Sequence, residues 1–194
     1  MKGWKQIFQA NRQEKKAAVE ILISDKIDFQ RRAIKRHPEG HFIILKGRIH
    51  QEDIHIVNIY APNIGAPKYI KKILEDFKKD IDSLTIMVGH FNTPLSKMDR
   101  SSKQNINKDI VSLNNTLEEM DLTNIYRAFH PKEAKYTIFS SVHGTFSKID
   151  YMIGHKPSFK KFKKIEIISS IFTDHRGLKL ETNPKGKNSK HSKS

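Results

Sequence analysis

The sequence predicts a single α/β domain in which sheets are flanked by helices. Three observations support this prediction. Short apolar segments with strand character are interspersed with two amphipathic helical segments, and no internal repeat or linker divides the chain. The length of 194 residues is enough for one domain with a sizeable core, whereas a second domain would be crowded.

Seven short segments have the character of β-strands. In residues 55–60 and 177–181 the apolar residues largely alternate with polar ones, as half-buried strands require. Residues 84–89 are apolar apart from Thr85 and therefore suit a buried central strand. The predicted strands are residues 18–24, 41–46, 54–61, 84–89, 149–154, 165–172 and 177–181.

Two longer segments have helical periodicity. In residues 67–82 five apolar residues fall on one stripe, with lysines and acids opposite, and Pro67 suits a first helical turn. Residues 108–121 repeat the pattern less cleanly. Between them, residues 93–107 are polar and predict a long loop that is either functional or mobile.

The charge balance favours a polyanionic partner. Lys and Arg number 36 against 21 Asp and Glu, which gives a net charge of +15 and a pI near 9.9. Such a surface attracts polyanions through counterion release, and the alternative explanation is a lysine-coated soluble domain. Residues 183–194 have nothing apolar to bury, so we predict a domain at 1–182 and a disordered basic tail at 183–194.

Composition also excludes several classes. No apolar run approaches the roughly 18 residues that cross a bilayer, and the N-terminus lacks the apolar core of a secretory signal. Cysteine is absent, which rules out disulfides and thiolate metal sites and is compatible with a reducing compartment.

Polar residues gather where the predicted strands begin or end, which is where such scaffolds present their sites. The stretch Gly89-His90-Phe91-Asn92-Thr93-Pro94 leaves an apolar strand, and Ser147-Lys148-Ile149-Asp150 enters another. The stretch Thr173-Asp174-His175 ends a third strand, and Tyr60-Ala61-Pro62-Asn63 closes a fourth.

Each of these features has an ordinary explanation when it is taken alone. Asp174-His175 is consistent with a turn and a solvated histidine, and Asp150 beside Lys148 with a surface ion pair of little energy. Asn92 before Thr93-Pro94 is common turn chemistry, and Tyr60 suits the edge of a core. Their co-occurrence and order are what indicate a site.

In these stretches the chain closely resembles the endonuclease domain at the N-terminus of the LINE-1 retrotransposon protein, which also carries the reverse transcriptase. That domain belongs to the endonuclease/exonuclease/phosphatase superfamily, together with apurinic-site endonucleases. The resemblance runs in unbroken order from Lys2 to about Leu180. It implies a four-layer α/β/β/α sandwich of two packed sheets and a metal-dependent enzyme that nicks DNA. The matching stretches include KGWKQIFQAN, AVEILISDK, VNIYAPNIGAP, GHFNTPLSKMDR, AFHPKEAKYTIFS, SKIDYMIG and TDHRGLKLE.

The resemblance implies a role for Asp150, Asp174 and His175. His175 would contact the scissile phosphate and stabilise its developing charge, while Asp150 would orient the imidazole ring and favour the imidazolium. Asp174 would lie at or near a divalent ion, most plausibly Mg²⁺, which prefers oxygen ligands.

Further residues would bind the substrate. Asn92 would hold the attacking water or a phosphate oxygen, and Tyr60 and Asn63 would hydrogen-bond the phosphate being cut. Ser147 is assigned to substrate binding. Arg100, in the polar loop, is either a contact to the DNA backbone or a solvated arginine.

One departure from the family pattern lies in the site itself. The family has Gly-Asp-Phe-Asn where this chain has Gly89-His90-Phe91-Asn92. The aspartate is the group thought to position or deprotonate water, and loss of a general base typically costs on the order of 10²–10⁴-fold in rate. His90 has the basicity to take a proton, but its nitrogens aim differently and its protonated form repels a metal. His90 occupies a catalytic position, and we therefore expect this chain to cleave DNA less well than the family does.

A second departure concerns the N-terminus. Family members begin with a strand carrying an asparagine, a helix, and a strand ending in a glutamate that is the principal metal ligand. This sequence starts after both strands, and neither Glu14 nor Glu20 is a substitute. We expect weak Mg²⁺ binding, exposed apolar faces and unpaired strand edges.

Three functions remain open. The chain is a weakened metal-dependent DNA endonuclease, a non-catalytic nucleic-acid-binding remnant, or a degenerate retrotransposon-derived protein with no selected role. The resemblance implies DNA as the partner and a monomer without a membrane or small-molecule cofactor. It also implies an intracellular protein, for which the nucleus is one option.

Overall fold

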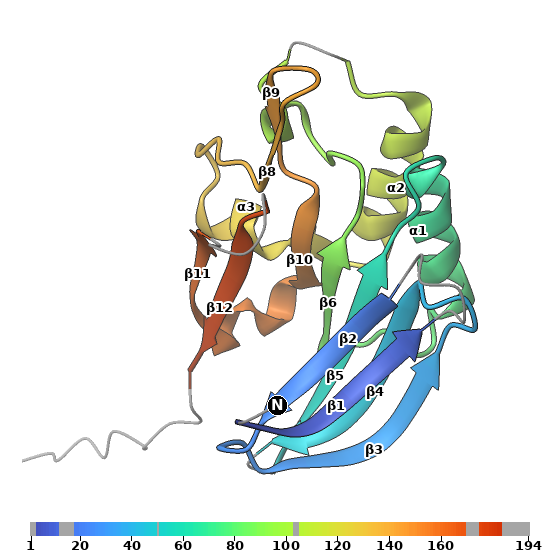
Figure 1. Ribbon diagram of the computed structural model, residues 1–194, viewed down its shortest axis with the longest axis vertical. Helices are drawn as coiled ribbons and strands as arrows, with labels where there is room; N and C mark the ends of the chain where they lie inside the picture. The colour runs from blue at the N-terminus through green and yellow to red at the C-terminus, as the bar shows by residue number, and fades with distance from the viewer. Residues whose placement is uncertain (1–2, 12–17, 50, 103–104, 170–174, 184–194) are drawn as a thin grey trace, which may run out of the picture.

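A computed structural model of the protein (Figure 1) describes residues 3–11, 18–49, 51–102, 105–169 and 175–183. The strands are β1 (Trp4–Asn11), β2 (Ala18–Ser24), β3 (Phe29–Arg36), β4 (Phe42–Ile49), β5 (Glu52–Tyr60), β6 (Thr85–His90), β7 (Leu122–Asn124), β8 (Ile138–Ser140), β9 (Thr145–Ser147), β10 (Asp150–His155), β11 (Phe162–Ile168) and β12 (Gly177–Thr182). The helices are α1 (Ala66–Asp76), α2 (Lys108–Glu119) and α3 (Ile125–Phe129), with 3-10 turns η1 (Lys97–Asp99) and η2 (Lys156–Lys161).

A six-stranded mixed sheet forms the centre of the molecule, in the order β3-β4-β5-β6-β10-β7. β5 and β6 are parallel, with Tyr60 opposite His90, and β6 and β10 are antiparallel, with His90 opposite Asp150. The register of these three neighbouring strands therefore places Tyr60, His90 and Asp150 in one row, at the ends of β5 and β6 and the start of β10.

Helices α1 and α2 cover one face of this sheet (Figure 1). Ile70 and Leu74 of α1 and Leu113 of α2 are fully buried against sheet residues that include Val57 and Met87. The helical stripe in the sequence thus corresponds to a real core face, and burying each such side chain contributes about 1.5–3 kcal/mol.

The opposite face of the sheet is covered by two separate antiparallel strand pairs. Residues that alternate with those facing α1 and α2 pack here, because successive strand side chains point to opposite faces. Ile43 and Leu45 contact β1 and β2, whereas Ile86 and Met152 pack with β11, β12 and α3. The predicted α/β fold is confirmed, and its second strand layer consists of the pairs β1-β2 and β11-β12.

The predicted elements differ from the structure at several boundaries. The strand predicted at 18–24 is β2, whereas α1 ends at Asp76, six residues before the predicted end. The segment after α1 instead places Asp80 between Lys35 and Lys46 of the sheet, at 2.6 and 2.9 Å. The strands that the sequence did not predict are β1, β3, β7, β8 and β9.

β3 shows why a strand was missed. Its sequence FQRRAIKR is largely exposed, with Phe29 its one buried residue. It forms the outer edge of the central sheet, where charged side chains discourage pairing with other chains. An edge strand therefore lacks the apolar signal by which buried strands are recognised.

Two predictions lie outside the described residues. Asn183 is the last described residue, so the predicted tail beyond it and the domain boundary at 182 remain predictions. Asp174 is likewise not described. In the ranges that are described, no helix is both long enough and apolar enough to cross a membrane.

Candidate active site

Three predicted site residues form one hydrogen-bonded cluster. His90 ends β6, Asp150 begins β10, and His175 precedes β12. The two oxygens of Asp150 face different rings: Oδ1 lies 2.9 Å from His90 Nδ1, and Oδ2 lies 3.0 Å from His175 Nδ1. All three side chains are half-buried, with exposed fractions of 18, 21 and 31% in the order His90, Asp150, His175.

Asn92 and Tyr60 extend this cluster. Asn92 has a left-handed backbone with φ of 50°, a conformation that asparagine tolerates better than most residues. Its side-chain amide donates to the Ala61 carbonyl at 2.7 Å, and its Oδ1 accepts a hydrogen bond from His90 Nε2 at 2.8 Å. The Tyr60 ring stacks on His90, with centroids 5.3 Å apart. Sequence reasoning placed both residues in the site, and the structure brings both against His90.

The amide orientation of Asn92 determines which nitrogen of His90 carries a proton. Because Asn92 donates its NH₂ group to the Ala61 carbonyl, its oxygen faces His90. His90 Nε2 must then be the donor of that hydrogen bond. In a neutral ring Nδ1 would present a lone pair to Asp150 Oδ1 at 2.9 Å, so a proton or another cation is needed between these two atoms.

The electrostatics of the site agree with this requirement. Burial lowers the pKa of His90, but the hydrogen bond and charge of Asp150 outweigh burial, and Asn92 adds to them, so the pKa lies above its ordinary value of 6.5. Burial likewise raises the pKa of Asp150, but hydrogen bonds from His90, Thr137 and His175 leave it below 3.8. The cluster therefore favours an imidazolium beside a carboxylate.

Thr137 supports the site from behind and was not predicted. Its Oγ1 accepts hydrogen bonds from the backbone amides of Ile149 and Asp150 at 3.2 and 3.4 Å. Its own carbonyl accepts from the Arg176 amide at 2.7 Å, which ties the chain next to His175 to the start of β10. The sequence signal was present in the stretch KYTIFS, but a threonine before a strand is too common to be selected.

The remaining predicted site residues lie further out. Arg100 and Ser147 form an isolated antiparallel bridge. Ser147 lies three residues before Asp150 along the chain. Asn63 is exposed and follows Tyr60 by three residues. The structure thus brings His90, Asp150, His175, Asn92 and Tyr60 into contact, and it places Asn63, Arg100 and Ser147 on neighbouring segments.

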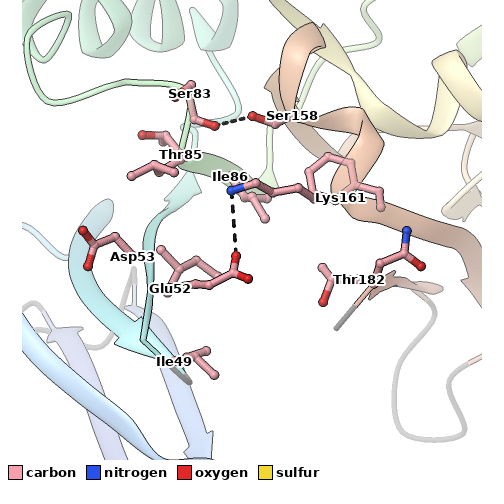
Figure 2. A pocket seen from close by; sticks show the side chains of 13 residues that line it. Ile49, Glu52, Asp53, Ser83, Thr85, Ile86, Ser158, Lys161 and Thr182 are labelled. Carbon is pink, nitrogen blue, oxygen red and sulfur yellow. Dashed lines mark hydrogen bonds and ion pairs between the residues drawn. The ribbon is translucent and has the colours of Figure 1, made fainter. Parts of the chain in front are cut away.

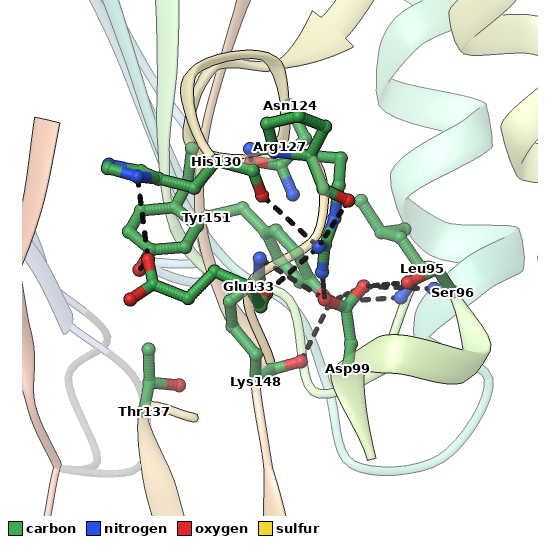
Figure 3. Close-up of polar contacts among 12 residues, drawn as sticks. Leu95, Ser96, Asp99, Asn124, Arg127, His130, Glu133, Thr137, Lys148 and Tyr151 are labelled. Carbon is green, nitrogen blue, oxygen red and sulfur yellow. Dashed lines mark hydrogen bonds and ion pairs between the residues drawn. The ribbon is translucent and has the colours of Figure 1, made fainter. Parts of the chain in front are cut away.

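A second polar cluster is centred on Asp99, which belongs to the polar loop of residues 93–107 (Figure 3). Asp99 is 2% exposed at its side chain, and its Oδ1 lies 3.1 Å from Lys148 Nζ and 3.2 Å from an Arg127 nitrogen. Its Oδ2 accepts hydrogen bonds from Ser96 and from the Tyr151 hydroxyl. Lys148 is fully buried, so the alternative of a surface ion pair with Asp150 is wrong: its partner is Asp99.

A pocket of about 440 Å³ opens at the other end of the central strands (Figure 2). It is lined by apolar side chains such as Ile54, Ile86 and Phe162, and Lys161 lies 3.8 Å from Glu52 across it. Ile86 is near the start of β6, whereas His90 ends that strand. None of the predicted site residues that the structure describes lines this pocket, so it is separate from the candidate site.

The architecture is shared with solved nucleases. No family model matches the chain. The endonuclease domain of TRAS1, a telomere-specific non-LTR retrotransposon, superposes with a TM-score of 0.70 at 14% identity, covering 93% of this chain and 81% of that one. An AP endonuclease from Archaeoglobus fulgidus gives 0.68 at 16% identity, covering 94% and 80%. The 3' phosphatase NExo from Neisseria, bound to a product DNA hairpin, gives 0.62 at 15% identity, covering 79% and 71%.

The chain therefore has the α/β fold of these solved enzymes, as the resemblance in the sequence implied. The similar structures are a retrotransposon endonuclease domain, an AP endonuclease and a 3' phosphatase. In this chain the candidate metal-ligand atoms of His90, Asp150 and His175 lie within 4.8 Å of one another.

Proposed function

We propose that this chain is a LINE-1-type, metal-dependent DNA endonuclease by descent, in which strand cleavage is impaired by His90. The observation that carries the proposal is that His90, Asp150 and His175 come from three segments and meet at one end of the central strands, in a fold shared with nucleases. DNA as the substrate is supported by the net charge of +15 and by the similar Neisseria enzyme, which was solved with a DNA hairpin.

In this proposal His175 contacts the scissile phosphate, and Asp150 holds the His175 ring through the 3.0 Å hydrogen bond. Tyr60 and Asn63 bind the same phosphate, and Arg100 and Ser147 bind the DNA backbone next to it. A bound divalent ion would polarise a phosphoryl oxygen and lower the pKa of water. Asn92 positions the nucleophile, a role for which its amide is already held by Ala61.

His90 impairs cleavage for two physical reasons. Its ring lies between Asn92 and Asp150 and is hydrogen-bonded to both, so it engages the groups that would hold water and orient His175. Its raised pKa also favours the imidazolium, which has no lone pair to accept a proton and repels a nearby cation.

The described donor atoms fit Mg²⁺ poorly. Mg²⁺ requires oxygen ligands in near-octahedral geometry, and among the described residues the cluster offers one carboxylate and two imidazoles. We therefore expect Mg²⁺ to bind weakly, with Asp174 and phosphate oxygens as the further ligands. A monomeric state and the absence of a small-molecule cofactor remain predictions.

A plasmid-nicking assay with Mg²⁺ tests the proposal. We expect His90→Asp to nick supercoiled DNA on the order of 10²-fold or more faster than the unmodified chain, since a positioned base contributes at least that much. His90→Asp with His175→Ala is the matched control for contaminating nucleases and should lose the gain. Nicking by the unmodified chain at the rate of the His90→Asp variant would contradict impairment by His90.

The second candidate function is nucleic-acid binding without cleavage, which the net charge of +15 favours. We expect a gel-shift titration to show affinity falling linearly with salt on a log–log plot. Arg100→Ala should weaken binding at every DNA sequence and reduce the salt slope by about 1. Lys68→Ala, at an exposed position on α1, is the matched control and should change neither. No shift at low salt would leave a degenerate protein as the remaining hypothesis.

A further inference from the structure

We propose that His90, Asp150 and His175 form a binding site for a divalent transition-metal ion of the zinc type, in preference to Mg²⁺. The three residues offer two imidazole nitrogens and one carboxylate, and their ligand atoms all lie within 4.8 Å of one another. The inference rests on the proposed function for the identity of the site, but metal binding itself is measured without DNA.

The spacing of the donor atoms already suits a coordination sphere. Donor atoms about 2.05 Å from one ion lie about 2.9 Å apart at a right angle and about 3.3 Å apart at a tetrahedral angle. The separations from the Asp150 oxygens to His90 Nδ1 and His175 Nδ1 are 2.9 and 3.0 Å. These two separations match those between neighbouring ligands of one ion, and all the candidate ligand atoms lie within 4.8 Å of one another.

The hydrogen bond of His90 to Asn92 presents the correct nitrogen. Metal-bound histidines almost always donate their other N–H to an oxygen, which fixes the tautomer and ring orientation. Here Nε2 donates to Asn92 Oδ1 at 2.8 Å, and Asn92 is itself held by the Ala61 carbonyl at 2.7 Å. The nitrogen that faces Asp150 is thus Nδ1, which becomes a ligand when a metal ion displaces its proton.

The ligand chemistry selects the class of ion. Imidazole suits Zn²⁺, Cu²⁺, Ni²⁺ and Fe²⁺, whereas Mg²⁺ prefers carboxylate, carbonyl and water oxygens. Two of the three donors are imidazoles, and one of them is supplied by His90, where the resembled family has an aspartate. The same substitution that impairs the nuclease site therefore changes its metal preference.

Cobalt absorption spectroscopy and calorimetry test this inference on the full chain after chelator treatment. We expect one equivalent of Co²⁺ to give visible bands of a nitrogen- and oxygen-ligated ion, one equivalent of Zn²⁺ to displace it, and millimolar Mg²⁺ to leave it in place. His90→Ala should weaken Zn²⁺ binding by at least 10–100-fold, the loss typical even for residues that only support a metal ligand. His90→Asp should bring the Zn²⁺ and Mg²⁺ affinities closer together.

His55→Ala is the matched control. His55 is also a half-buried histidine 3.0 Å from an aspartate, Asp82, but it lies outside the cluster and should leave Co²⁺ and Zn²⁺ binding unchanged. Circular dichroism of each variant separates unfolding from ligand loss, and His90→Gln provides a second variant that keeps a polar side chain.

The outcomes separate this inference from the proposed function. An aqueous Co²⁺ spectrum with the folded wild-type chain, or equal loss in the His55 and His90 variants, would overturn the metal site while leaving the nicking result to decide the nuclease. Zn²⁺ binding that requires His90, in a chain whose His90→Asp variant does not nick, would support the metal site and refute the nuclease.

Discussion

Gly89→Ala is expected to destabilise the protein by on the order of 4 kcal/mol or more, a loss that rivals the 5–15 kcal/mol of a typical domain. Gly89 has a φ of +135°, a region that is essentially restricted to glycine. A Cβ atom at this position would lie 2.0 Å from the Ile59 carbonyl oxygen of the neighbouring strand. The clashing oxygen belongs to the backbone of β5, which is hydrogen-bonded to β6 in a parallel pair. A side-chain rotation therefore cannot relieve the clash.

Urea denaturation of the two variants Gly89→Ala and Gly65→Ala measures this effect. Gly65 also has positive φ, of +75°, but a Cβ there meets no atom within 4 Å, so its substitution reports backbone strain without a clash. We expect Gly65→Ala to cost about 1–2 kcal/mol. Equal losses in the two variants would mean that β5 and β6 do not approach each other as closely as the structure has them.

Asp99→Asn is expected to cost about 3–5 kcal/mol, because it leaves buried cations without their counter-charge. Asp99 balances both Arg127 and Lys148, and the latter is fully buried between the rings of Tyr126 and Tyr151, 4.8 and 5.4 Å from their centroids. Burial lowers the pKa of Lys148, and Asp99 opposes that shift. The carboxylate therefore counteracts the loss of positive charge that burial favours.

Two further variants make the prediction specific. Lys148→Met removes one cation but leaves Asp99 paired with Arg127, so we expect a much smaller loss than for Asp99→Asn. Lys72→Ala breaks an exposed ion pair with Asp76 and should cost less than about 0.5 kcal/mol. Thermal unfolding followed by circular dichroism ranks the three. A loss for Asp99→Asn no larger than that for Lys72→Ala would contradict a stabilising role for the buried cluster.

The buried cluster marks a limit of sequence reasoning. Residues 93–107 are polar in sequence and were predicted to be a long loop, functional or mobile. In the structure Asp99 lies at the end of η1 and is buried, and its charged partners come from α3 and from the segment between β9 and β10. Composition assigns charged residues to the surface, since they are almost never buried unless they are paired. The pairing partners are distant along the chain, so no local pattern identifies them.

The site was more predictable than this cluster. Tyr60, His90 and Asp150 stand at strand ends that the sequence itself indicates, because apolar runs stop there and polar residues follow. The resemblance then supplied their order along the chain. Thr137 and the Ala61 carbonyl were missed because they act through hydrogen bonds that only the folded chain creates.

The sequence by itself determined the α/β class, the strong strands and helical stripe, and the substitution of a histidine in a nuclease-like motif. These follow from periodicity and residue type, which are local properties of a chain. The tertiary structure decided which groups that histidine contacts. Strand register places His90 beside Asp150, the left-handed turn at Asn92 supplies its second partner, and His175 arrives from a distant segment. A set of metal ligands is defined by the distances between side chains, and these distances are fixed only once the sheet has formed.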